Sequence, residues 1–187
     1  RPKSNIISNQ RLTSKLKHGG VDFIELRSLD LNPFSRIGID EETVYFLEVF
    51  LIYCFLNKSH LINQDELKAI WDNDSLVAKR GRDPSLLLQK NKTSISLQEW
   101  GKQIIDEMTP IAELLDGEET VYKDMMCNIA SKIKDPDQTL SGLLLDKVIT
   151  EKVSFIDLGN TIGETNKQHY LDLEKSENPN WDRLEKE

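Results

Sequence analysis

The sequence is poor in cysteine and has no long apolar run. Only two of its 187 residues are cysteines, Cys54 and Cys127, and their spacing forms no CxxC motif. This usage argues against a disulfide framework and favours two buried thiols in a reducing cytoplasm. The most apolar window, Val44 to Leu56, is shorter than the roughly 20 residues that cross a bilayer. We therefore expect a cytoplasmic protein that does not contact a membrane.

Motifs that carry chemistry by themselves are also missing. The sequence holds no HExxH, no Ser/His/Asp arrangement within a short stretch and no glycine-rich loop of the GxxxxGK type. Its three histidines, His18, His60 and His169, are isolated from one another. Candidates for residues that carry chemistry are therefore few.

Basic charge is scarce overall but concentrated at one end. The chain has 24 Lys and Arg against 32 Asp and Glu, a formal net charge of −8, which argues against nucleic-acid binding. With 38% hydrophobic and 30% charged residues, its composition is that of a soluble globular protein. The first 20 residues nevertheless contain no acid and five basic residues: Arg1, Lys3, Arg11, Lys15 and Lys17. An anionic ligand would be drawn to this amino-terminal end.

The chain opens with "RPKSNIISNQ", without a methionine or an apolar signal segment. We expect that residue 1 is not the natural start and that the sequence is the carboxy-terminal part of a longer protein.

Most of the sequence predicts helices. Asp40 is a candidate N-cap of a helix over Val44 to Leu56, which is apolar nearly all round and should lie buried among other helices. Asn63 and Ser96 each stand three residues before a glutamate and predict two further helix starts. We expect a break at residues 72–75 in the helix that Asn63 begins. More helices are expected over residues 118–134, 140–149 and 154–175.

One stretch, "GGVDFIELRSLDLNPF", predicts a strand over residues 21–28. Alternation along a strand puts Glu25 and Arg27 on the same face, roughly 6.5 to 7 Å apart. One side chain could hold a cation and the other an anion, which suits a metal–nucleotide site. An ordinary ion pair at a sheet edge explains the same pattern, and the residues alone leave both interpretations open. We expect the sheet partners of this strand to lie outside the sequence.

The run "KLKHGGVDFIELRSLDLNPFSRIGIDEETVYFLEVFLIYCFL" resembles the proteobacterial type of glutamate–cysteine ligase, and "RPK" resembles the short basic motif that precedes this strand in that family. The resemblance continues through "RGRDPS" and "DPDQTLSGLLLD" and spans most of the chain. It implies the carboxy-terminal portion of an α+β, glutamine-synthetase-like catalytic fold, here mainly α with one or two strands. It also implies two regions: residues 1–38, the end of the catalytic sheet with strand 21–28, and residues 39–187, a helical subdomain.

The resemblance further implies an activity and a set of site residues. Enzymes of this family join the γ-carboxylate of L-glutamate to the amine of L-cysteine, using ATP and an acyl phosphate, in the first step of glutathione biosynthesis. Carried over, Glu25 would be a ligand of Mg²⁺ or Mn²⁺, Arg27 a catalytic residue that binds the transferring phosphoryl group, and Arg1 and Lys3 contacts to the ATP phosphates. The missing amino-terminal part would be a necessary partner, so this chain alone should be inactive.

A second class of function is an alternative to the ligase. The composition and the number of expected helices fit a non-catalytic helical binding or regulatory module equally well. In such a module, Glu25 and Arg27 would simply pair with each other.

Overall fold

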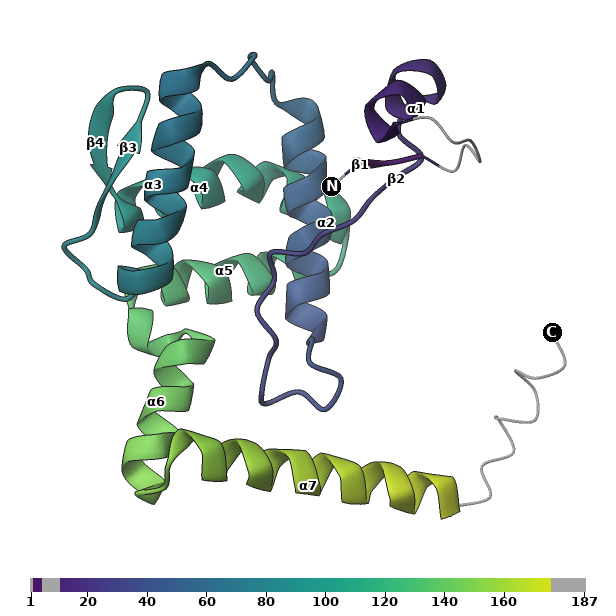
Figure 1. Cartoon of the computed structure of the whole chain (residues 1–187), viewed down its shortest axis with the longest axis vertical. Helices are drawn as coiled ribbons and strands as arrows, with labels where there is room; N and C mark the ends of the chain where they lie inside the picture. Colours follow the sequence, from purple (N-terminus) through teal and green to yellow (C-terminus); the bar gives the residue numbers. More distant parts are fainter. Residues whose placement is uncertain (1, 5–10, 176–187) are drawn as a thin grey trace, which may run out of the picture. The chain divides into compact units, whose positions relative to one another are not determined.

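The computed structural model describes residues 2–4 and 11–175, which form two compact units, residues 1–31 and 32–187. The smaller unit contains β1 (Pro2–Lys3), α1 (Leu12–Gly19) and β2 (Phe23–Ile24) (Figure 1). Its two strands pair antiparallel, with Pro2 opposite Ile24 and Lys3 opposite Phe23.

Two sequence expectations for this strand are wrong. The strand covers Phe23–Ile24 rather than residues 21–28, so Glu25 and Arg27 follow its end. One of its partners, β1, lies within the chain. The "RPK" motif supplies that partner because its Pro2 and Lys3 form the strand itself.

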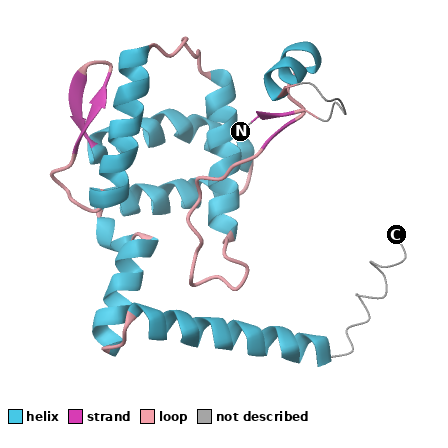
Figure 2. Ribbon diagram, viewed as in Figure 1, coloured by secondary structure: helices cyan, strands magenta, loops and turns pink. Residues whose placement is uncertain are grey.

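The larger unit is mainly helical (Figure 2). It contains α2 (Glu41–Leu56), α3 (Gln64–Arg80), α4 (Leu97–Asp116), α5 (Val121–Lys134), a 3₁₀ turn η1 (Pro136–Gln138), α6 (Leu140–Glu151) and α7 (Phe155–Lys175). A hairpin of β3 (Leu87–Lys90) and β4 (Thr93–Ser96) joins α3 to α4. The mainly α class predicted from the sequence is therefore confirmed, and the strands of the described residues are short and antiparallel.

The helix starts follow from the capping residues. The side chains of Asp40, Asn63 and Ser96 accept hydrogen bonds from the backbone N–H three residues later, at 2.8, 2.9 and 3.1 Å. Each bond satisfies a backbone donor that has no partner inside its helix. These three predicted helix starts are confirmed. The expected break at residues 72–75 is absent, because α3 continues through them.

The core lies where α2, α4 and α5 meet. Its buried side chains are Val49 from α2, three from α4 and two from α5: Ile105, Met108, Ala112, Met125 and Met126. The prediction that α2 lies fully buried among other helices is wrong, because it packs on α4 and α5 while Phe55 is 88% exposed. The two cysteines, expected to be buried, are also exposed. No helix among the described residues is long and apolar enough to cross a membrane.

Candidate functional site

Three charged side chains of the smaller unit meet at the end of its strand pair. Lys3 lies on β1, opposite Phe23, and its Nζ is 2.8 Å from Oε2 of Glu25. The Nε of Arg27 donates a hydrogen bond to the other carboxylate oxygen of Glu25. Antiparallel pairing and the two-residue spacing therefore bring together residues from two separate segments. The two-residue spacing put Glu25 and Arg27 side by side, and their pairing was one of the two interpretations left open, but no feature of the sequence indicated that Lys3 would pair with Glu25.

The two cations fix the charge of Glu25. Hydrogen bonds from Arg27 and then Lys3 favour the ionised carboxylate and lower the pKa of Glu25 from 4.5 to about 2. The same contact raises the pKa of the Arg27 guanidinium. All three side chains remain open to solvent, with exposed fractions of about a third to a half. The cluster therefore carries one net positive charge and is accessible to an anion.

Glu25 fits a divalent metal as one ligand. A carboxylate is a hard oxygen donor, and Mg²⁺ in nucleotide sites is held by one or two carboxylates together with phosphate oxygens and water. Glu25 is ionised above pH 4, so protons do not compete with a metal there. The described residues contain no group of three His, Cys, Asp or Glu side chains that could hold a metal ion. Further metal ligands would have to come from phosphate, water or additional chain.

Arg1 lies outside the described residues. Of the two basic residues predicted to contact ATP phosphates, the structure therefore describes Lys3 only, and it pairs this residue with Glu25.

The two other motifs that resemble the ligases, "RGRDPS" and "DPDQTLSGLLLD", contact each other within the larger unit. Arg82, from "RGRDPS", donates from Nη2 to Oδ1 of Asp137, from "DPDQTLSG", at 2.6 Å, although 55 residues separate them. Arg80 pairs with Asp83, which also accepts bonds from the backbone and hydroxyl of Ser85. The contacts of Asp83 therefore close the turn after α3, and the Arg82–Asp137 pair joins this turn to η1. Neither the resemblance nor the residue pattern predicted the contact between them.

Comparison with known proteins shows which family this chain resembles. Residues 1–77 match the family model of glutamate–cysteine ligase. The chain is 33% identical over 165 residues to a glutamate–cysteine ligase of Shewanella oneidensis and 34% identical over 178 residues to one of Wigglesworthia glossinidia brevipalpis. These alignments cover 88% and 93% of this chain, but only 32% and 34% of the two relatives.

A solved structure agrees with the sequence comparison. The crystal structure of a glutamate–cysteine ligase from Francisella tularensis in complex with AMP superposes with a TM-score of 0.79 at 27% identity, covering 90% of this chain and 33% of that one. The chain is thus similar, in sequence and in fold, to about a third of a glutamate–cysteine ligase. More particularly, the predicted resemblance to the carboxy-terminal part of the proteobacterial type is confirmed. The chain spans about a third of the length of the curated relatives that it matches.

Proposed function

We propose that this chain is the carboxy-terminal part of an ATP-dependent ligase that joins the γ-carboxylate of L-glutamate to the amine of L-cysteine. The observation that carries the proposal is the exposed cluster of Lys3, Glu25 and Arg27 within residues 1–77, the segment that matches the family model. The AMP bound to the Francisella tularensis relative supports a nucleotide as the ligand of this family's site.

The reaction proceeds through an acyl phosphate. A γ-carboxylate oxygen of glutamate attacks the terminal phosphorus of ATP, and ADP leaves. The cysteine amine then attacks the acyl carbon, and inorganic phosphate leaves. Negative charge shifts at the phosphoryl group in the first step, so fixed cations that lie close to it stabilise the transition state.

Each member of the cluster has a distinct role in this reaction. Arg27 binds the transferring phosphoryl group, because a guanidinium can hold two oxygens at once and stays charged at any working pH. Lys3 neutralises ATP phosphate as a point charge, and Arg1 contributes a second. Glu25 holds Mg²⁺ or Mn²⁺, which when bound offsets the charge of the polyphosphate. Without nucleotide, the carboxylate of Glu25 pairs with Lys3 and Arg27. When nucleotide binds, its phosphates replace this carboxylate as the partner of the two cations.

The remainder of the active site is supplied by the amino-terminal part that the relatives possess and this sequence lacks. One carboxylate is too few for a magnesium–nucleotide site that must also bind two amino acids. We therefore expect the 187-residue chain alone to be inactive.

The first test is ATP-dependent formation of γ-glutamylcysteine by the full-length protein that contains this sequence, with the 187-residue chain as the control. The ligase predicts product only from the full-length protein. A non-catalytic helical module, the alternative class, predicts product from neither.

A sharper test substitutes the cluster in the full-length protein. Arg27→Lys keeps the charge but loses the paired donors, so kcat should fall about ten- to hundredfold with a smaller change in KM for ATP. Glu25→Gln should raise the Mg²⁺ concentration needed for half-maximal rate. The matched control is Arg80→Lys, which makes the same change at an arginine that pairs with Asp83 in the helical unit. Near-normal turnover of Arg27→Lys would contradict the catalytic role.

A further inference from the structure

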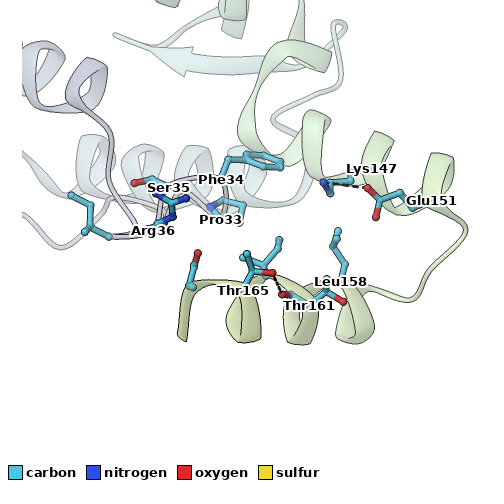
Figure 3. A pocket seen from close by; sticks show the side chains of 12 residues that line it. Pro33, Phe34, Ser35, Arg36, Lys147, Glu151, Leu158, Thr161 and Thr165 are labelled. Atoms are coloured by element: carbon cyan, nitrogen blue, oxygen red, sulfur yellow. Dashed lines mark hydrogen bonds and ion pairs between the residues drawn. The ribbon is translucent and has the colours of Figure 1, made fainter. Parts of the chain in front are cut away.

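A cavity of about 730 Å³ lies within the helical unit, away from the charged cluster in sequence (Figure 3). Its walls are the loop of residues 33–37, the end of α6 and one face of α7. A second cavity of about 330 Å³ adjoins it and shares Phe34, Lys147 and Glu151. Small-molecule sites typically occupy roughly 300 to 1,000 Å³, so the space suits a ligand larger than one amino acid.

Hydrogen bonds hold the loop in one shape. The buried side chain of Asn32 donates to Asp40 at 2.6 Å and accepts from the backbone N–H of Phe34 at 2.9 Å. The hydroxyl of Tyr170 on α7 donates to the backbone carbonyl of Arg36 at 3.2 Å and ties the loop to that helix. The loop backbone is therefore fixed before any ligand arrives, while the side chains of Phe34 and Ile37 remain exposed at the cavity.

The charges around the cavity are divided between its ends. Figure 3 shows Arg36 at one end and the Lys147–Glu151 pair at the other, with Phe34 between them. Among the described residues, no carboxylate lies within ion-pair distance of the Arg36 guanidinium. At the opposite end, Nζ of Lys147 lies 3.2 Å from Oε1 of Glu151, and Asp146 lines the adjoining cavity. This end therefore has two acidic side chains and one basic side chain. One end is net positive and the other net negative.

The surface between these ends can contact a peptide. Ile162 of α7 supplies apolar contact at this cavity, beside the buried Leu158, and Phe34 is exposed there. The hydroxyls of Thr161 and Thr165 donate to carbonyls of their own helix at 2.9 and 2.8 Å, which leaves their oxygen lone pairs to accept from a ligand N–H.

We propose that this cavity binds a short zwitterionic peptide of two or three residues. Arg36 binds the terminal carboxylate, Asp146 and Glu151 bind the terminal ammonium, and an apolar side chain of the peptide packs on Phe34 and Ile162. A polyphosphate fits poorly because two carboxylates line one end. An uncharged apolar ligand would leave Arg36 without a partner. The proposal does not depend on the ligase activity.

The test is titration of the 187-residue chain with glycyl-leucyl-glycine. Binding is measured by calorimetry and by the amide chemical shifts of the loop and α7. Two blocked forms of the tripeptide, one with an amidated carboxyl end and one with an acetylated amino end, each remove one terminal charge. We expect saturable binding of the free peptide and roughly tenfold or greater weakening for each blocked form, because each loses charge-assisted hydrogen bonds.

Variants identify which end binds which charge. Arg36→Gln should weaken the free peptide about tenfold yet leave the amidated peptide unchanged, and Glu151→Gln should do the same for the acetylated peptide. Asp106→Asn is the matched control, since Asp106 forms a similar exposed pair with Lys102 on α4. Equal affinity of free and blocked peptides, tighter binding of inorganic phosphate, or no shift of loop amides up to millimolar peptide would each overturn the proposal.

Discussion

The interactions inside the amino-terminal unit differ from those inside the helical unit. In the former, strands of two residues each pair beside exposed Phe23 and Ile24, and the close contacts join Lys3, Glu25 and Arg27. In the latter, α2, α4 and α5 enclose side chains that are fully buried, such as Met108. Apolar burial is the main favourable term in folding, and exposed ion pairs contribute little. We infer that the helical unit carries the stability and that the charged cluster serves binding.

The largest expected effect is in the core. Met108→Ala removes a side chain with no exposed surface, so it should lower the free energy of unfolding by about 2 to 5 kcal/mol. Leu114→Ala on the same helix, at a position 82% exposed, should change it by about 0.5 kcal/mol or less. Urea unfolding followed by circular dichroism measures both. Similar losses for the two variants would show that α4 is not packed as described.

A backbone contact in the helical unit predicts the next effect. A Cβ on Gly142 would lie 2.4 Å from the carbonyl oxygen of Asp137, so Gly142→Ala must displace the turn that precedes α6. Overpacking of this kind costs about 1 to 3 kcal/mol. Gly163→Ala in α7 meets no atom within 4 Å and should instead stabilise by about 0.5 to 1 kcal/mol. Thermal unfolding should shift in opposite directions for the two variants.

Sequence reasoning worked where the signal is local. A capping side chain and the N–H that it accepts are three residues apart, so Asp40, Asn63 and Ser96 could be identified without knowing the tertiary structure. Helix α1 was missed because Arg11 at its start makes no side-chain cap. The hairpin of β3 and β4 was also missed, although Asn91 and Lys92 adopt positive φ as a two-residue hairpin loop requires, and asparagine is common there.

Reasoning failed where the partner is distant in sequence. The apolar pattern of α2 predicted burial all round, but burial depends on which elements pack against it, and in the described residues α4 and α5 cover one side. The contacts of Lys3 with Glu25 and of Arg82 with Asp137 likewise depend on tertiary structure. The predicted roles of Glu25 and Arg27 came from resemblance, and their proximity came from the two-residue spacing.

Two tyrosines sharpen the comparison at high pH. Tyr53 donates to Glu107 at 2.5 Å and Tyr122 to Glu48 at 2.6 Å, and these bonds raise the pKa of each phenol to about 12. The unfolded phenols ionise near pH 10. Stability should therefore be intact below pH 10 and decline as the pH rises toward 12. Replacing both tyrosines by phenylalanine should make melting temperature less dependent on pH above 10, with parallel curves between pH 7 and 8.5. Identical slopes above pH 10 would contradict these bonds.

The smallest effect is expected at the charged cluster of the amino-terminal unit, and only in acid. Glu25 has a pKa of about 2 in the folded chain against 4.5 as its ordinary value, so its contribution is present above pH 4.5 and disappears as the pH falls toward 2. Glu25→Gln lacks the ionised form at every pH. Melting curves of the 187-residue chain and this variant should differ slightly and by a constant amount from pH 5 to 8, then converge below pH 4. Because Glu25 is exposed to water and salt, the difference at neutral pH should shrink further in 0.5 M sodium chloride. A large difference that persists in salt and in acid would mean that Glu25 supports the fold of its unit. The inference that the helical unit carries the stability would then be wrong.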